Sequence, residues 1–453
     1  MIGMAGLFSG LSSNIYFPSL DAISRDLNVS LEAVSLTITS YLIIQGISPL
    51  FWGPLSDTIG RRPVYIASFS VYIVANFILS FSPNFSVFLI ARGLQSAGSA
   101  STVSIVRNFS IAIGPVLGGL LANFLGFRSI FVFLTILSGL VLVILLVYLP
   151  ETLRRIAGNG TLRLSGVYQP FIRRFTKDPE YMEDPGGRPE VPKVTLKTFA
   201  APIKLLAEKD IIALLVSGGM VYTIWSMLVA STTGIFKERF GLNELMLGFA
   251  FLPNGFGTIV GSYVAGKIMA RDFVRFEQLY LETHPGAPAP SKSKKAFASD
   301  FPIEHARLRS IPWITLIFVV STATYGFTVL PVDQLPPQAA NPAWIALPLF
   351  LQFLIAATSN AVFAINTTLV SDLCPGKGAS STAVNNLVRC SMGAVGVGVV
   401  ESMLAHVGRA GTFVALALLV VAMSAIYAVE WYWGMQWRQQ REMKKNALDT
   451  EKV

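Results

Sequence analysis

Residues 53–63 read Gly53-Pro54-Leu55-Ser56-Asp57-Thr58-Ile59-Gly60-Arg61-Arg62-Pro63 and separate two long apolar runs, Val34–Trp52 and Val64–Phe81. Each run is close to the roughly 20 residues that carry a helix across a bilayer. The stretch is therefore predicted to be a short, glycine-rich turn at a membrane face. Arg61 and Arg62 put that face on the cytoplasmic side, because Lys and Arg in short loops set the orientation of membrane proteins.

The residues of this turn predict a conformational role. Gly53 and Gly60 allow close helix contact and an unusual backbone turn. Asp57 can accept hydrogen bonds from the N-terminal N–H groups of a helix or pair with an arginine, and we expect it to stabilise the inward-closed state in one of these ways. The stretch resembles the loop between helices 2 and 3 of the major facilitator superfamily. That family pattern is roughly Gly-x-Leu-x-Asp-x-x-Gly-Arg-Arg/Lys, and each of its positions matches here.

The composition of the whole chain is that of a polytopic membrane protein. Of its 453 residues, 53% are hydrophobic and 13% are charged, which is about half the charged fraction of soluble domains. The net charge of +9 is expected to sit in cytoplasmic loops beside anionic lipid rather than to bind nucleic acid. The N-terminus lacks the basic region and cleavage site of a secretory signal, so we expect a first membrane helix there.

Residues that carry chemistry are scarce. Cys374 and Cys390 are the only cysteines, and His284, His305 and His406 are the only histidines. They form neither a disulfide framework nor a metal cluster, and we expect His284 and His305 to be solvated in a polar loop. No constellation typical of a nucleophile accompanies them, so the sequence predicts neither an enzyme nor a bound cofactor or metal.

The apolar runs predict an all-α membrane protein with twelve transmembrane helices in two pseudo-symmetric halves of six. The predicted spans are 2–20, 33–53, 63–82, 86–106, 109–126, 128–149, 210–234, 244–268, 311–331, 343–371, 380–404 and 409–433. The predicted domains are an N-terminal half at 1–149, a cytoplasmic linker at 150–209, a C-terminal half at 210–433 with a cytoplasmic loop at 272–309, and a tail at 434–453. Basic residues gather in the linker, this loop and the tail, which predicts that both termini are cytoplasmic.

An arginine lies inside the fourth predicted span. The run Arg92-Gly93-Leu94-Gln95-Ser96-Ala97-Gly98 resembles the superfamily motif Arg-x-x-Gln-Gly-x-Gly, with Ser96 in the place of the first glycine. The resemblance links Arg92 to proton transfer. A second interpretation is that Arg92, about two turns into its helix, extends to the outer headgroups. The small residues of the run are more simply a close-packing face.

The fifth predicted span contains Gly114-Pro115-Val116-Leu117-Gly118-Gly119. Glycines around a proline make a bendable helix with a flat contact face. The run resembles the Gly-Pro-x-x-Gly-Gly motif of the antiporter branches of the superfamily, which gives Gly114, Pro115, Gly118 and Gly119 a conformational role.

Glycines also recur in the eighth predicted span, at Gly255, Gly257 and Gly261. No strand precedes them, so we interpret them as helix-packing positions and not as a dinucleotide turn. The internal symmetry of such transporters predicts that the eighth span packs against the fifth.

The second half carries further polar motifs, Asn366-Thr367-Thr368-Leu369-Val370-Ser371-Asp372 and the run from Gly378 to Cys390. Together with Leu149-Pro150-Glu151-Thr152-Leu153, they are similar to the fungal twelve-span drug:proton antiporters of the quinidine-resistance type, over nearly the whole chain. Asn385, Asn386 and Arg389 lie one or two turns into the eleventh span. They can form a cytoplasmic hydrogen-bond gate with Asp372 and Asp57, or they can contact the substrate.

The connection between the fourth and fifth spans is unusually short. Ser104-Ile105-Val106 runs almost directly into Arg107-Asn108, where family members usually have a longer cytoplasmic loop. We expect a very tight reversal at Arg107 and Asn108, because fusing the two helices would place the basic loops on opposite faces of the membrane. A truncated or splice product that does not transport is the alternative.

Acidic residues deep in the membrane are also scarce, since Asp57 and Asp372 are predicted near the inner face and Asp21 and Glu401 near the outer face. Proton coupling is therefore implied by the resemblance alone. The substrate cavity is expected between the halves, near the bilayer midplane. Its candidate lining residues, each of which can equally be an interhelical contact, are Tyr16, Gln45, Arg92, Gln95, Tyr222, Trp225, Gln352, Asn360, Asn385 and Asn386.

The resemblance implies a secondary active transporter for multidrug efflux, which exports drugs or secondary metabolites in exchange for protons. A polyamine or organic-acid carrier is the alternative within transport, and Arg92 and Arg389 favour an anion over a polyamine. The expected partners are a small-molecule substrate, protons and the lipid bilayer, and the expected state is a monomer. The expected location is the plasma membrane, with the vacuolar membrane as the alternative.

Glycan mapping tests the predicted topology. Asn28-Val29-Ser30 lies in the first non-cytoplasmic loop and should accept an N-linked glycan in a eukaryotic host. Asn159-Gly160-Thr161 should remain unmodified, because it is predicted to be cytoplasmic. Glycosidase-sensitive gel shifts of the Asn28→Gln and Asn159→Gln variants measure both sites. A glycan on Asn159 would reverse the assigned orientation.

Overall fold

The structure is a computed structural model that describes residues 2–99, 107–176, 180, 182–184, 199, 202–285, 290, 298, 300–334, 342–375 and 377–450. Helices account for 86% of it. Within these ranges, the only β interaction is a single bridge between Leu162 and Glu183. The predicted all-α class is confirmed. The short connection at Ser104–Val106 lies outside the described residues, and the next helix begins at Arg107.

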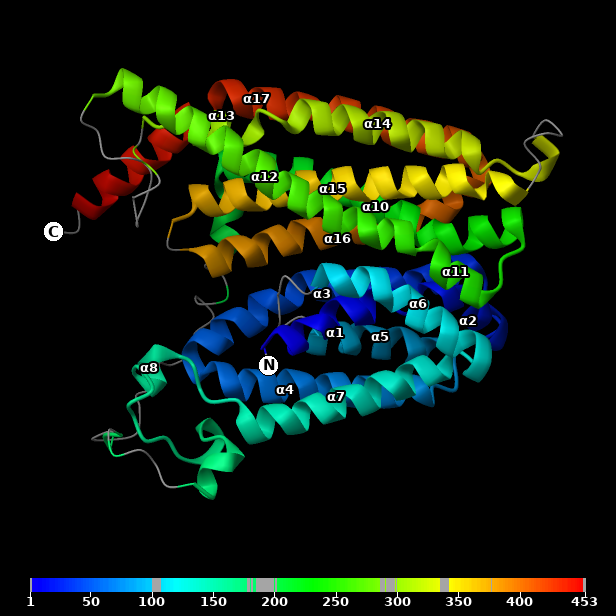
Figure 1. Cartoon of the computed structure of the whole chain (residues 1–453), viewed down its shortest axis with the longest axis horizontal. Helices are drawn as coiled ribbons and strands as arrows, with labels where there is room; N and C mark the ends of the chain where they lie inside the picture. Colours follow the sequence, from blue (N-terminus) through cyan, green and yellow to red (C-terminus); the bar gives the residue numbers. More distant parts are fainter. Residues whose placement is uncertain are drawn as a thin grey trace. The chain divides into compact units, whose positions relative to one another are not determined.

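The chain divides into two compact units, and the first comprises Met1–Ala201 together with Leu242–Phe251 (Figure 1). Its α-helices are α1 (Ile2–Asn14), α2 (Leu20–Asp26), α3 (Leu31–Ile59), α4 (Arg61–Ser80), α5 (Phe85–Ser99), α6 (Arg107–Leu125), α7 (Arg128–Tyr148), α8 (Arg154–Ala157) and α11 (Glu244–Ala250). Helix α4 packs on α5 and α7, and α6 packs on α1 and α11. A cluster of Phe8, Phe69, Tyr72, Val141 and Leu145 is buried among α1, α4 and α7.

The second unit comprises Pro202–Gly241 and Leu252–Val453. Its α-helices are α10 (Lys209–Phe240), α12 (Leu252–Thr283), α13 (Ile303–Leu308), α14 (Ile311–Thr328), α15 (Ala346–Leu373), α16 (Gly378–Val407) and α17 (Arg409–Thr450). The closest pairs are α12 with α15, α10 with α16, and α14 with α17. The predicted boundaries of the halves, linker and tail stay predictions.

Nine segments of the described chain are long and apolar enough to cross a membrane. They are Leu31–Ile59, Arg61–Ser80, Arg128–Tyr148, Lys209–Phe240, Glu244–Thr283, Ile303–Thr328, Ala346–Leu373, Gly378–Val407 and Arg409–Lys444. Helix α6 contributes a shorter apolar stretch at Phe109–Leu125. The expected membrane character is confirmed, and the count of twelve spans stays a prediction.

The helices of two predicted spans are interrupted, although Glu244–Thr283 remains one segment that can cross a membrane. The first span, predicted as 2–20, breaks after Asn14, and residues Phe17–Ser19 form a 3-10 helix. Pro18 explains the break, because a proline ring clashes with the carbonyl four residues earlier, which belongs to Asn14. The eighth span breaks at Phe251, between α11 and α12, and Pro253 occupies the first turn of α12, where proline is tolerated.

Two helices also extend far beyond their predicted ends. Helix α12 continues to Thr283 instead of ending at 268, and α17 continues to Thr450 instead of ending at 433. Both extensions are rich in Arg, Lys, Glu and Gln, which are good helix formers in water. The prediction followed hydropathy, and hydropathy marks where the membrane ends but not where the helix ends.

The glycines of α6 allow two neighbouring elements to approach closely. A Cβ atom on Gly118 would lie 1.5 Å from the carbonyl oxygen of Ile15, and a Cβ on Gly119 would lie 2.5 Å from that of Glu244 in α11. The predicted contact between the fifth and eighth spans is therefore confirmed. In α12, a Cβ on Gly261 would lie 2.1 Å from the carbonyl oxygen of Ala357 in α15, so the eighth-span glycines are packing positions as expected.

Replacing Gly118 with alanine should destabilise the first unit. The new methyl group meets backbone, which cannot move aside as a flexible side chain can, so we expect a loss at the upper end of the roughly 1–3 kcal/mol typical of overpacking. Thermal unfolding of purified Gly118→Ala measures the loss. Gly139→Ala on α7 is the matched control, since a Cβ there would meet nothing within 4 Å. Equal melting temperatures for the two variants would contradict the close contact.

Candidate functional site

The turn between α3 and α4 is held by a carboxylate from another part of the first unit. Glu151, which follows α7, accepts hydrogen bonds from the backbone N–H groups of Arg61 and Arg62, at 3.0 Å each. It also accepts from the N–H groups of Thr152 and Leu153 at 2.8 Å each. These donors include the first two amides of α4, where a negative charge is favourable because of the helix dipole.

Arg62 makes the complementary contact with the end of α7. Its guanidinium donates to the carbonyl oxygens of Leu145 at 3.1 Å and Leu146 at 2.9 Å, and also to that of Leu149. Its Nε donates to the carbonyl oxygen of Val167 at 2.6 Å. Arg62 is 3% exposed and Glu151 is 5% exposed. A buried cation therefore caps the C-terminus of α7, and a buried anion caps the N-terminus of α4.

The other predicted residues of this turn have different surroundings. Gly60 has a φ of +107°, and a Cβ there would also lie 2.6 Å from Glu151 Oε2, so this position requires glycine. A Cβ on Gly53 would meet nothing within 4 Å. Asp57 is exposed, and the acceptor at the start of α4 is Glu151. Sequence reasoning gave Glu151 no role, although it quoted the residue in the Leu149–Leu153 motif.

Arg92 is fully buried inside the first unit, at 0% exposed. Its guanidinium carbon lies 3.9 Å from the ring centroid of Tyr16 and 4.7 Å from that of Tyr41, which are cation–π contacts. Its Nη1 donates to the carbonyl oxygen of Ser12 at 3.3 Å and to Gln95 Oε1. This burial excludes the interpretation in which Arg92 extends to the headgroups.

The helix 4 motif continues this polar network. Gln95 Nε2 donates to Asn76 Oδ1 at 2.6 Å, so α5 is bonded to α4 next to the arginine. Ser96, the departure from the family motif, donates to the carbonyl oxygen of Tyr41 on α3 at 2.7 Å. Gly98 confirms the close-packing interpretation, because a Cβ there would lie 2.5 Å from the backbone nitrogen of Tyr72. Among the residues that the structure describes, Arg92 Nε and Nη2 nevertheless have no hydrogen-bond partner.

The second unit buries an arginine in a similar way. Arg389 on α16 is 3% exposed, and its guanidinium carbon lies 4.4 Å from the ring centroid of Tyr222 and 4.9 Å from that of Phe363. Its Nη2 donates to Asn386 Oδ1, and its Nε has no hydrogen-bond partner. The neighbouring Asn385 donates to Thr367 Oγ1 at 2.9 Å.

Most of the other cavity candidates are engaged within their own units. Trp225 donates to Asn254 Oδ1 at 2.8 Å, and Gln352 donates to Thr232 Oγ1 and to Tyr325 Oη at 3.1 Å each. Asn360 donates to the carbonyl oxygen of Thr258 at 2.6 Å and to Ser262. Tyr16 Oη lies 3.2 Å from Thr37 Oγ1. Gln45 is buried in α3. In this conformation these groups make interhelical or local polar contacts, and their role toward a substrate stays a proposal.

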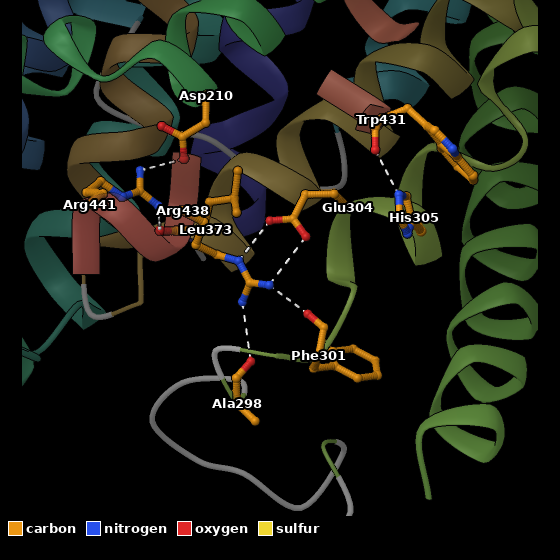
Figure 2. Close-up of polar contacts among 9 residues, drawn as sticks. All are labelled: Asp210, Ala298, Phe301, Glu304, His305, Leu373, Trp431, Arg438 and Arg441. Atoms are coloured by element: carbon orange, nitrogen blue, oxygen red, sulfur yellow. Dashed lines mark hydrogen bonds and ion pairs between the residues drawn. The ribbon is translucent and has the colours of Figure 1, made fainter. Parts of the chain in front are cut away.

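A second set of charges, which sequence reasoning largely missed, lies in the second unit where α10, α13 and α17 meet (Figure 2). Arg438 pairs with Glu304 at 2.8 Å and donates to the carbonyl oxygen of Phe301 at 2.6 Å. Arg441 pairs with Asp210 at 2.9 Å and donates to the carbonyl oxygen of Leu373, at the end of α15, at 2.9 Å. The signal that could have found them was the pattern of acids and arginines at the ends of apolar runs.

Two sequence expectations change at this end of the unit. Asp372, expected in a gate with Asn385, Asn386 and Arg389, pairs with Arg307 at 3.0 Å. His305 was expected to be solvated, and the structure shows it partly buried. Its Nε2 donates to the carbonyl oxygen of Trp431 at 2.7 Å, and the two ring centroids lie 4.4 Å apart. His284 remains half-exposed and lies 3.5 Å from Asp300.

Removing the carboxylate of Glu151 should loosen the first unit. Hydrogen bonds to a charged group contribute about 1.5–3 kcal/mol each, so Glu151→Ala should lower the melting temperature of the purified protein clearly. Asp57→Asn is the matched control, since Asp57 is an exposed carboxylate of the same turn, and it should leave the melting temperature unchanged. If both variants melt like the wild type, Glu151 does not cap α4.

Comparison with known proteins places these features in a family. The sequence profile of the Major Facilitator Superfamily matches residues 2–108 and 101–397, and its two matches overlap at the short connection after α5. The chain is 43% identical to Citrate exporter 1 of Aspergillus niger, over 99% of this chain and 87% of that protein. That alignment spans 472 positions, more than the 453 residues of this chain, so the relative contains residues that this chain lacks.

Other similar proteins include a drug transporter and a solved structure. Multidrug transporter AQR1 of Candida glabrata is 27% identical over 98% of this chain and 77% of its own length. The crystal structure of the human organic anion transporter MFSD10 superposes with a TM-score of 0.53, at 15% identity, over 94% of this chain and 98% of that chain. The structural similarity to MFSD10 supports a transporter fold of the same kind. The chain therefore belongs to the major facilitator superfamily of multi-pass membrane transporters.

Proposed function

We propose that this protein exports small organic anions that carry carboxylate groups, in exchange for protons. The observation that carries this proposal is the pair of buried arginines, Arg92 in the first unit and Arg389 in the second. Each has an aromatic contact and at least one guanidinium nitrogen without a hydrogen-bond partner. Neither makes an ion pair within the described part of the chain.

The guanidinium charges of Arg92 and Arg389 lack an anionic partner within the described part of the chain. A buried guanidinium is costly unless it is paired and fully hydrogen-bonded, and its planar N–H groups match a carboxylate in particular. The tyrosine and phenylalanine faces stabilise the cations while no anion is present. Because the rings also cover the guanidinium groups, a substrate carboxylate can reach either arginine only after these rings move aside.

Relatives support two substrate classes. Citrate exporter 1 is named for a small tricarboxylate, and at 43% identity it favours the organic-acid alternative of the sequence analysis. Multidrug transporter AQR1 supports the other candidate, export of drugs or secondary metabolites, which was the first expectation from the sequence. We rank the organic anion first because the two unmatched buried charges are cationic.

The proposal keeps the coupling ion, location and oligomeric state that the sequence analysis predicted. Protons are the expected coupling ion, and the plasma membrane is the expected location, with both termini in the cytoplasm. The expected state is a monomer. The short connection before Arg107 keeps a non-transporting product as the competing interpretation. Comparing efflux by this chain with efflux by a variant that carries a relative's longer connection distinguishes the two.

Efflux of labelled citrate from a transporter-deficient yeast strain tests the substrate class. Arg92→Gln and Arg389→Gln should each reduce efflux roughly ten- to hundredfold, since a charge-assisted contact contributes about 1.5–3 kcal/mol. Arg128→Gln is the matched control, because Arg128 is 40% exposed and makes a surface ion pair with Asp26. Full citrate export by both arginine variants, or export of a cationic drug but no organic acid, would overturn the proposal.

Collapse of the proton gradient tests the coupling. A protonophore should abolish export while cellular ATP remains available, if export uses the proton gradient. ATP-driven pumping is not expected, because the phosphate-loop-like spacing Gly261–Lys267 lies inside helix α12 and not in a loop. Export that survives the protonophore but stops on ATP depletion would contradict proton exchange.

Asp57→Asn tests the gating role of the α3–α4 turn. The substitution keeps the size of the side chain and removes its charge. A contact that Asp57 makes only in another conformation of the transport cycle would then be lost, and the equilibrium between the conformations would shift. Transport should fall while substrate binding in detergent survives. A normal transport rate in an otherwise active protein would show that this turn is no gate.

A further inference from the structure

The acid and base groups at the junction of α10, α13 and α17 do not balance. Three buried carboxylates meet there, from Asp210, Glu304 and Glu430, and they are 1%, 1% and 0% exposed respectively. Two arginines, Arg438 and Arg441, pair with Glu304 and Asp210 (Figure 2). Within the part of the chain that the structure describes, no arginine is left for Glu430, and both of its carboxylate oxygens are buried without a hydrogen-bond partner. We call these five residues the acid cluster.

Glu430 lies close to Glu304 in the acid cluster. A Cβ atom on Gly434, one turn further along α17, would lie 2.8 Å from Glu430 Oε1 and 3.3 Å from Glu304 Cγ. Glu430 and Glu304 therefore both lie beside Gly434 on α17. Within the described chain, this packing holds two acids close together while one arginine, Arg438, serves Glu304.

The surrounding charges increase the cost of ionising Glu430. The charged groups that act on it are Asp210 of α10, Glu304 of α13 and Arg441 of α17. Two of these are carboxylates, and the one cation is already paired with Asp210 at 2.9 Å. Asp372 on α15 is paired with Arg307 at 3.0 Å and does not change this balance. An ionised Glu430 would be a buried anion without a donor or a counter-ion, which is strongly unfavourable.

We propose that Glu430 is a proton-binding site, which holds one proton in this packing and releases it only when α10, α13 and α17 separate. On release, the O–H bond of the carboxyl group breaks, the proton passes to water that enters the acid cluster, and the carboxylate remains. Proton binding at Glu430 therefore favours the closed packing of these three helices. This coupling rests on the proposed proton exchange, for which the sequence analysis identified no carboxylate deep in the membrane.

Infrared difference spectroscopy of the purified full-length protein tests this site without any substrate. At neutral pH the wild type should show the carbonyl stretch of a protonated carboxyl group, and the band should disappear at high pH. Glu430→Gln, which has nearly the shape of the neutral acid, should lack this band. Glu442→Gln, on the same helix and outside the acid cluster, should retain it.

The pH dependence of thermal stability gives a second readout of the same site. In the proposed state, the folded protein holds a proton on Glu430. The unfolded chain releases this proton once the pH rises above the ordinary pKa of a glutamate side chain, about 4.3. Stability should therefore fall as the pH rises from that value toward neutrality, because the folded state binds more protons. Glu430→Gln should have a shallower slope, and Glu442→Gln should match the wild type.

The outcomes separate the site from the proposed function. Absence of a protonated-carboxyl band in the wild type at neutral pH overturns the proposal even if the variants fail to fold, and so does a band that persists in Glu430→Gln. A band that depends on Glu430 supports the site. If that band is present while a protonophore leaves export intact, proton exchange fails as a function but the proton-binding site stands.

Discussion

Charge in this protein is buried where helix ends can stabilise it. In the membrane, backbone groups at helix ends have no water to bond, and an isolated side-chain charge is equally costly. In the first unit, the same contacts satisfy the helix ends and the buried charges. Glu151 accepts hydrogen bonds from the first amides of α4, and Arg62 donates to the last carbonyl groups of α7. The basic turn between α3 and α4 therefore also connects the start of α4 to the end of α7.

The second unit also buries acids and arginines where helices meet. The acid Glu304 lies just before α14, and the arginine Arg438 lies on α17, the helix that packs against α14. Arg438 also donates a hydrogen bond to the carbonyl oxygen of Phe301, and Arg441 donates one to the carbonyl oxygen of Leu373 at the end of α15. Each unit thus contains a buried arginine that contacts a buried acid or carbonyl groups at the end of another element.

Arg92 and Arg389 do not follow this principle, and this is why they are the best functional candidates. Both lie within helices, face aromatic rings and keep at least one nitrogen unbonded. Glu430 is the acidic counterpart, since its oxygens have no donor. Among the described residues, Arg62, Glu151, Glu304 and Arg438 have polar partners, whereas atoms of Arg92, Arg389 and Glu430 lack one, and this difference supports the proposed carboxylate and proton ligands.

The sequence by itself determined the local properties. Apolar run length predicted the membrane class, Gly60 with its positive φ was recognisable as a turn, and the small residues of α5 and α6 were recognised as contact faces. Pro18 and Pro253 carried the signals for two helix breaks that the hydropathy reading passed over. Such features depend on neighbours a few residues away, so they can be derived from local sterics and hydrophobicity.

Only the tertiary structure decided which charges meet. The bond between Arg62 and Glu151 joins residues 89 positions apart, and that between Glu304 and Arg438 joins residues 134 positions apart. No periodicity in the sequence encodes such pairings. They depend on which helices pack together and on small residues such as Gly434 that allow close approach. For the same reason, Asp57 looked like the capping acid in the sequence, whereas the fold gives that position to Glu151, because the end of α7 packs beside the start of α4.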